Sequence, residues 1–199
     1  MVRVLNIAVF ASGRGSNFEA LHRTIGEENI PARIAVVISN NSAAGALNLA
    51  RSFGIPALHL SQRQFPGPAD FHQAVLQSLA QYRTDLIVLA GYMKKMDAAV
   101  VRAYSQRIIN IHPALLPKFG GEGMYGMHVH AAVLAAGETE SGASVHYVDE
   151  EYDRGAVIAQ QRVPVLPGDT PETLAARVLT AEHTLLPSVV KQIALNHRP

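Results

Sequence analysis

Asn110 and His112 interrupt a short apolar segment, and their side chains could donate hydrogen bonds and transfer protons. The segment 107–117 reads R-I-I-N-I-H-P-A-L-L-P, and its isoleucines favour a buried strand. Pro113 has no backbone N–H to continue the pairing, so we expect the strand to end at His112. In an open parallel sheet, ligands bind at the carboxyl ends of the strands. Taken alone, the two residues could equally be structural, as an amide bonded to backbone and a satisfied strand-end histidine.

A glycine-containing loop near the amino terminus could bind an anion. The sequence S-G-R-G-S-N at 12–17 lies between an apolar segment and a helix-like one. Gly15 allows close approach of the backbone, and Ser16 and Asn17 are residue types that cap helix N-termini. Such a loop can hold a phosphate on backbone N–H groups, or it can be an ordinary tight turn. It matches neither of the common nucleotide-binding glycine patterns.

Two further segments bring possible ligand-binding groups. The sequence G-Y-M-K-K-M at 91–96 combines an aromatic and two thioethers with two lysines, which suits a flat heteroaromatic ligand with an acidic tail. The same apolar side chains could instead fill the core. The sequence D-E-E-Y-D-R-G at 149–155 resembles a solvated acidic turn, except that Gly155 could turn Asp153 inward, and we expect this loop at the same sheet edge as His112.

The segment 118–130 contains four glycines and little hydrophobic period, so we expect a long loop at the site. His128 and His130 form an H-x-H pair within it. No third ligand lies at a spacing known from metal sites, so we predict no metal.

Alternating apolar segments must position these loops. Strands are expected at 6–11, 34–39, 57–60, 86–90 and 108–112, and helices at 18–24, 43–53, 69–82, 97–104 and 129–136. This alternation predicts an α/β fold with a Rossmann-like, doubly wound, mostly parallel sheet and helices on both faces. The segments 142–148 and 156–164 are expected to form an antiparallel strand pair. A last helix should start at Asp169 or Thr170 and be kinked or interrupted at Pro187.

The composition favours one compact enzyme domain that spans 1–199. A chain of 199 residues with 48% hydrophobic content is long enough for one core and too short for two large domains. The formal net charge of +1 gives no general attraction for nucleic acid or an anionic membrane. The absence of cysteine excludes disulfides and thiolate chemistry. We expect a cytoplasmic location, because we find neither a signal-peptide cleavage site nor an apolar segment of roughly 20 residues. We also expect a monomer or homodimer.

Several motifs in order resemble the folate-dependent formyltransferase family, and they cover nearly the whole chain. They are A-S-G-R-G-S-N, L-A-G-Y-M-K-K-M, N-I-H-P-A-L-L-P, G-A-S-V-H-Y-V-D-E-E-Y-D-R-G and R-V-L-T-A-E-H. The resemblance implies transfer of a formyl group from 10-formyltetrahydrofolate, as co-substrate, to the amine of a phosphorylated ribosyl-glycinamide in purine biosynthesis. It implies small-molecule partners, and neither a metal nor a covalent enzyme intermediate.

The same resemblance implies roles for individual residues. Asn110 would stabilise the developing negative oxygen, His112 would act as the acid and move the proton, and Asp153 would hold His112 charged and oriented. The sugar phosphate is expected at Gly15, Ser16 and Asn17, and the amine-bearing substrate near Glu182. The folate is expected among Met93, Lys94, Lys95, Met96, Asp149, Glu150, Glu151 and Tyr152.

The sequence departs from the family at two places. The segment 65–69 lacks an arginine that some members direct towards the folate, which leaves Lys94, Lys95 or another cation to recognise the glutamate tail. The glycine-rich insert 120–126 is also longer than in many members.

Three other functions remain open. A formyltetrahydrofolate deformylase would use water as the acceptor, but that family normally carries an amino-terminal regulatory domain. A methionyl-tRNA formyltransferase would need a carboxyl-terminal RNA-binding domain and a basic surface. In a non-enzymatic module with a vestigial site, the polar residues at the strand end could be replaced without loss of activity.

Overall fold

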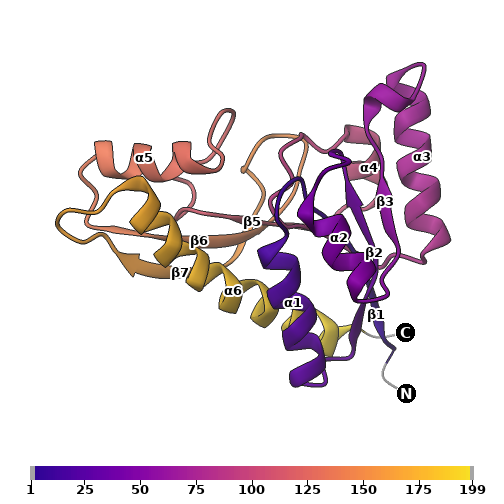
Figure 1. The fold of residues 1–199 in the computed structure, drawn as a ribbon, viewed down its shortest axis with the longest axis horizontal. Coiled ribbons are helices and arrows are strands. Elements are labelled where there is room, and N and C mark those ends of the chain that lie inside the picture. Colours follow the sequence, from indigo (N-terminus) through magenta and orange to yellow (C-terminus); the bar gives the residue numbers. More distant parts are fainter. Residues whose placement is uncertain (1–2, 198–199) are drawn as a thin grey trace.

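One seven-stranded sheet organises the molecule in the computed structural model, which describes residues 3–197 (Figure 1). Its strands are β1 (Leu5–Phe10), β2 (Ala32–Ser39), β3 (Ala57–His59), β4 (Leu86–Leu89), β5 (Ile108–His112), β6 (Glu140–Tyr147) and β7 (Val157–Pro164). The spatial order is β3-β2-β1-β4-β5-β6-β7. Strands β1 to β5 are parallel, whereas β6 is antiparallel to both β5 and β7. The predicted α/β fold class is confirmed, and the antiparallel part of the sheet also includes the β5–β6 pairing.

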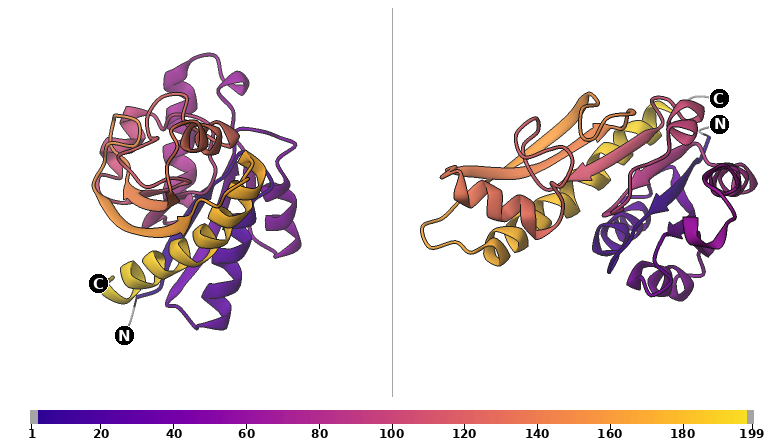
Figure 2. Two further views of the ribbon diagram at one scale, coloured as in Figure 1. Left: turned by 90° about the vertical axis from the view of Figure 1, so that its left-hand side faces the viewer. Right: turned by 90° about the horizontal axis from the view of Figure 1, so that it is seen from above.

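Helices cover both faces of the sheet, as Figure 2 shows. One core contains side chains from α1 (Ser16–Glu27), α2 (Gly45–Ser52) and α6 (Pro171–Asn196), and the opposite core contains those of α3 (Pro68–Gln81) and α4 (Ala98–Ala103). The remaining helix, α5 (Met127–Ala135), packs against α6, and a 3-10 turn spans Gln62–Gln64. No helix among residues 3–197 is long and apolar enough to cross a membrane.

The alternation of side chains in β5 explains why a strand can carry two polar groups. Ile109 and Ile111 are buried in the core beneath α6, while Ile108 is buried in the core beneath α4. Asn110 and His112 project from the same face as Ile108, because successive side chains of a strand alternate. They extend beyond the apolar cluster of that face and line a cleft.

The last helix corrects one expectation. It begins as predicted, with Thr170 as its N-cap in a reciprocal cap with Thr173, but it continues without interruption through Pro187 to Asn196. Proline removes one helical hydrogen bond. Residues on both sides of it, Leu186 and Val190, are fully buried, so packing against the sheet offsets that loss.

The starts of two helices also differ from expectation. Helix α5 starts at Met127, so the glycine-rich loop is shorter than the sequence indicated. The N-cap of α1 is Gly15, in the left-handed conformation with φ 89°, and Ser16 and Asn17 lie inside the first turn. A Cβ atom at Gly15 would lie 2.8 Å from Ala46 of α2, so close packing between the two helices requires a glycine there.

Candidate active site

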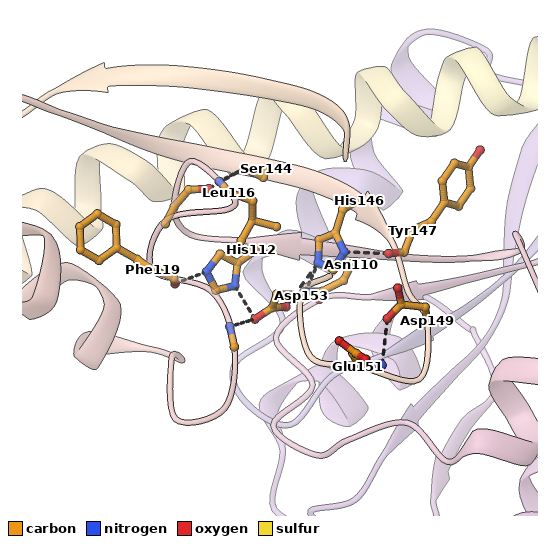
Figure 3. Close-up of polar contacts among 12 residues, drawn as sticks. Asn110, His112, Leu116, Phe119, Ser144, His146, Tyr147, Asp149, Glu151 and Asp153 are labelled. Atoms are coloured by element: carbon orange, nitrogen blue, oxygen red, sulfur yellow. Dashed lines mark hydrogen bonds and ion pairs between the residues drawn. The ribbon is translucent and has the colours of Figure 1, made fainter. Parts of the chain in front are cut away.

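A cleft of about 820 Å³ opens where β1, β4 and β5 end. Asn110, His112 and Asp153 all line it, together with the unexpected His146. Figure 3 shows Asp153 between the two imidazoles, with Asn110 beside His146. The structure therefore brings together the three residues for which a catalytic role was expected.

His112 is fixed at one ring nitrogen and faces a carboxylate with the other. Its Nε2 lies 2.8 Å from the carbonyl oxygen of Phe119, which can only accept, so Nε2 carries a proton. Its Nδ1 lies 3.6 Å from Oδ2 of Asp153 (Figure 3). Since this separation exceeds a normal hydrogen bond, Nδ1 remains available for proton exchange with a bound molecule.

The pKa values of this pair are shifted by burial and by each other. Burial lowers the pKa of His112 below its usual range, and the charge of Asp153 and the carbonyl of Phe119 act in the opposite direction. Burial alone would raise the pKa of Asp153, but the adjacent ring of His146, the charge of His112 and the N–H of Gly121 lower it. Asp153 is therefore an anion at neutral pH.

The loop that carries Asp153 takes a path that we did not expect. Tyr147 pairs with Ile109, and the N–H of Val148 donates to the carbonyl of Ile108, so the chain leaves β6 at the amino end of β5. The loop then returns across the face of the sheet to place Asp153 beside His112. The acidic loop does not simply extend from the carboxyl edge.

Two glycines permit this return. A Cβ atom at Gly155 would lie 1.8 Å from the carbonyl oxygen of Tyr147, so the chain passes directly against β6. A Cβ atom at Gly120 would lie 2.5 Å from Leu116 and 3.1 Å from Asp153. The expectation that Gly155 turns Asp153 inward agrees with this geometry.

At the other end of the cleft, Glu182 is buried beside Asn17. The amide of Asn17 donates to Oε2 of Glu182 at 2.5 Å, although the two residues are 165 positions apart. Burial raises the pKa of Glu182 to about 7, and the hydrogen bond from Asn17 opposes this rise. The Oδ1 atom of Asn17 is buried without a partner among the described residues. At this end of the cleft, Oδ1 of Asn17 can therefore accept a hydrogen bond from a polar molecule, and the carboxyl group of Glu182 can bind or release a proton near neutral pH.

The predicted folate-binding turn at 91–96 forms one wall of the cleft. Met93 is 50% exposed, whereas Met96 is only 7% exposed and also belongs to the core beneath α4. The N–H of Met93 donates to Oγ of Ser12, which ties this turn to the glycine loop after β1. Lys95 places its Nζ 5.2 Å from the ring of Tyr152 on the opposite loop.

Most of the expected binding residues line the cleft, but three do not. Gly15 is buried against α2, and Ser16 is not among the lining residues. Glu150 is exposed and forms an ion pair with Arg102 outside the cleft. The residues that do line it are Asn17, Met93, Lys94, Lys95, Met96, Asp149, Glu151, Tyr152 and Glu182.

Three residues with no predicted role, Arg14, His130 and His146, also line the cleft. His130 is 5% exposed, its Nδ1 lacks a partner among the described residues, and burial together with the charge of His112 lowers its pKa. His146 is a polar residue in the expected strand 142–148, and this was the signal that the sequence offered; its pairing opposite Asn110 is visible only in the structure.

The H-x-H pair does not converge on a common point. His128 is exposed while His130 is buried, because residues two apart on a helix face different directions. Within residues 3–197, no three His, Asp or Glu side chains form a group that could hold a metal ion.

The arrangement suits reactions at a carbonyl carbon. An amide N–H can stabilise negative charge on oxygen, and an imidazole next to a carboxylate can move protons between a nucleophile and a leaving group. The apolar wall and the lysines leave room for a large planar ligand with an acidic part.

Comparisons with known proteins agree with this chemistry. The family model described as formyl transferase matches residues 5–190. A Bacillus subtilis protein named phosphoribosylglycinamide formyltransferase is 41% identical over 192 residues, which cover 96% of each chain. A crystal structure of glycinamide ribonucleotide transformylase 1 from Symbiobacterium toebii has 38% identity and a TM-score of 0.90, covering 97% of this chain and 89% of its own.

A plant relative is longer than this chain. The chloroplastic phosphoribosylglycinamide formyltransferase of Vigna unguiculata is 42% identical over 197 residues, and the match covers 96% of this chain but 62% of that protein. The chain thus spans less than two thirds of that relative. Because the family model and the Bacillus protein match along almost the entire sequence, this chain belongs to the formyl transferase family.

Proposed function

We propose that this protein transfers the formyl group of 10-formyltetrahydrofolate to the amine of 5-phosphoribosylglycinamide, a step of purine biosynthesis. The observation that carries the proposal is that Asn110, His112 and Asp153 line one cleft, with Nδ1 of His112 3.6 Å from Oδ2 of Asp153. The names of the relatives that match over most of the chain support the choice of substrates.

The proposed reaction needs no covalent enzyme intermediate. The amine nitrogen attacks the formyl carbon, and the carbonyl electron pair moves to oxygen, where the N–H of Asn110 and the positive charge of His112 stabilise it. The attacking nitrogen loses a proton, and the folate nitrogen gains one as its bond to carbon breaks. His112 can pass this proton through Nδ1, because Nε2 is held by Phe119. The products are the formylated amide and tetrahydrofolate.

The two ends of the cleft suggest where each substrate binds. The folate ring would lie against Met93 and Tyr92, with its acidic tail near Lys94 or Lys95. The ribonucleotide would extend towards Asn17 and Glu182, with its phosphate near the start of α1. The cleft of about 820 Å³ is within the range for sites that bind small molecules.

The test compares folate product with and without the amine. We expect the purified protein to form tetrahydrofolate and formylated ribonucleotide in equal amounts, and to form little of either when the ribonucleotide is omitted. Equal rates with and without the amine would indicate a hydrolase that uses water instead. Absence of both reactions, in protein that binds folate, would indicate a binding module.

Four further properties remain predictions. We expect only small-molecule substrates, a cytoplasmic location, a single domain, and a monomer or homodimer. Cell fractionation and sedimentation at several protein concentrations would test the location and the oligomeric state.

A further inference from the structure

We propose that His146 is a positioning residue that holds the side-chain amide of Asn110 with its N–H group towards the cleft. The proposal deepens the function proposed above, and its effect on turnover rests on that function. His146 does not need to touch a substrate, because its contacts run to Asn110, Asp153 and the backbone of Tyr147.

The hydrogen bonds fix the proton positions one after another. Nδ1 of His146 lies 2.8 Å from the carbonyl oxygen of Tyr147, which can only accept, so Nδ1 carries the proton. In the neutral ring, Nε2 is then an acceptor. It lies 3.1 Å from the amide of Asn110, and only the amide's Nδ2 can donate to it (Figure 3). The orientation of the Asn110 amide therefore follows from the tautomer of His146.

This orientation matters because the side-chain amide has an oxygen that only accepts hydrogen bonds and an NH₂ group that only donates them. If the Asn110 side chain were rotated by 180°, its oxygen would take the place of the N–H group and repel negative charge that develops on a formyl oxygen. The Nδ2 atom carries two hydrogens. His146 uses one of them, and the other remains for a molecule in the cleft.

The surrounding fold keeps His146 in a single position. It is 2% exposed and lies directly opposite Asn110 in the antiparallel β5–β6 pairing. The register of β6 with β7 shifts between Val145 and His146, and such bulges redirect side chains next to active sites. The titratable groups that face His146 are Asp153, whose Oδ1 is 3.4 Å from Nε2, and His112.

Two substitutions distinguish the loss of the hydrogen-bond acceptor at Nε2 from the loss of the ring itself. In His146→Gln, the longer side chain can place a carbonyl oxygen near the former Nε2 position, whereas in His146→Asn the shorter side chain cannot reach it. We expect kcat to stay within about threefold of wild type in the Gln variant and to fall roughly tenfold or more in the Asn variant. Complete loss of an oxyanion donor, which costs about 10²–10³-fold, sets the upper limit. The KM values for both substrates should change by less than about threefold.

A double-mutant cycle tests whether His146 acts through Asn110. In an Asn110→Ala background, adding His146→Asn should change kcat by less than about twofold, because no amide remains to be oriented. A loss in that background as large as in wild type would overturn the proposal. Equal losses in the Gln and Asn variants would overturn it as well, because a purely structural role would not distinguish them by their acceptor.

Nitrogen-15 NMR tests the same idea without substrates, so it does not depend on the proposed function. We expect the ring of His146 to carry its proton on Nδ1, and the side-chain NH₂ signals of Asn110 to move in His146→Asn and return towards wild type in His146→Gln. A proton on Nε2, in either a neutral or a doubly protonated ring, would overturn the proposal. If the NMR result holds while wild-type protein transfers no formyl group, the proposed reaction fails and the positioning role of His146 stands.

Discussion

The Oδ2 atom of Asp153 lies 3.6 Å from Nδ1 of His112 and accepts the N–H of Gly121 at 2.9 Å. The carboxylate is therefore anchored by the glycine-rich loop, and its position does not depend on His112. Because this loop also supplies the carbonyl of Phe119 that holds Nε2, it fixes both partners of the pair. The glycine-rich segment thus shapes the proposed reaction centre as well as the wall of the cleft.

Asp153→Asn should lower kcat by roughly 10²-fold or more, the scale of a positioned acid–base group, while folate binding changes little. Removing an anion beside His112 makes its charged form less favourable, so its pKa falls further. The alkaline limb of the pH–rate profile that belongs to His112 should therefore move to lower pH. Steady-state kinetics between pH 5 and 9 would measure both effects.

The matched control for this prediction is Glu140→Gln, which also removes one carboxylate. Glu140 lies at the start of β6 in an exposed ion pair with Arg162, outside the cleft. It should leave both kcat and the pH–rate profile unchanged. A profile in Asp153→Asn that coincides with that of wild type would remove Asp153 from the mechanism.

The sequence predicted those parts of the site that depend on local chemistry. The end of β5 at His112 follows from Pro113, and the turn that brings back Asp153 requires Gly155. Long-range contacts were not predictable in this way. Which residue orients the amide of Asn110 depends on strand register, and the contact between Asn17 and Glu182 joins residues 165 positions apart.

The continuity of α6 and the path of the acidic loop were also not predictable from local sequence. A proline inside a helix is unfavourable locally, but the buried residues around Pro187 gain more from packing than the missing bond costs. The loop after β6 was expected at the carboxyl edge because its strand was not known to pair antiparallel with β5.

Glu182→Gln should make stability less dependent on pH. Burial raises the pKa of Glu182 from 4.5 to about 7, so the folded protein binds a proton more tightly than the unfolded chain. The stability that this group contributes is present below about pH 4.5 and is lost as the pH rises towards 7, by at most about 3 kcal/mol. Relative to wild type, the Gln variant should gain melting temperature from pH 5 to pH 8. An equal difference at both pH values would contradict the raised pKa.

Gly155→Ala should destabilise the protein and impair catalysis together. A Cβ atom would lie 1.8 Å from the carbonyl oxygen of Tyr147, so the backbone must move and displace Asp153. We expect a loss of roughly 1–3 kcal/mol of unfolding free energy, as for other overpacked sites, with a fall in kcat. Gly26→Ala in α1 is the control, because a Cβ atom at this position would meet nothing within 4 Å. This substitution should raise the free energy of unfolding by about 0.5–1 kcal/mol. Urea denaturation of both variants would test this, and a neutral result at Gly155 would contradict the described loop path.

Lys94→Ala and Lys95→Ala should each raise the KM for 10-formyltetrahydrofolate about two- to fivefold, because exposed lysines attract an acidic tail by no more than about 1 kcal/mol. Lys95 should have a smaller effect on kcat than on KM, since it lies over the ring of Tyr152, on the side of the cleft where we propose that the folate binds. Higher salt should weaken wild-type binding and reduce the difference between wild type and the variants. Lys118→Ala is the control, because Lys118 pairs with Glu138 at 2.7 Å outside the cleft. If Lys118→Ala raised KM as much as the other two variants, general surface charge and not the turn at 91–96 would recognise the tail.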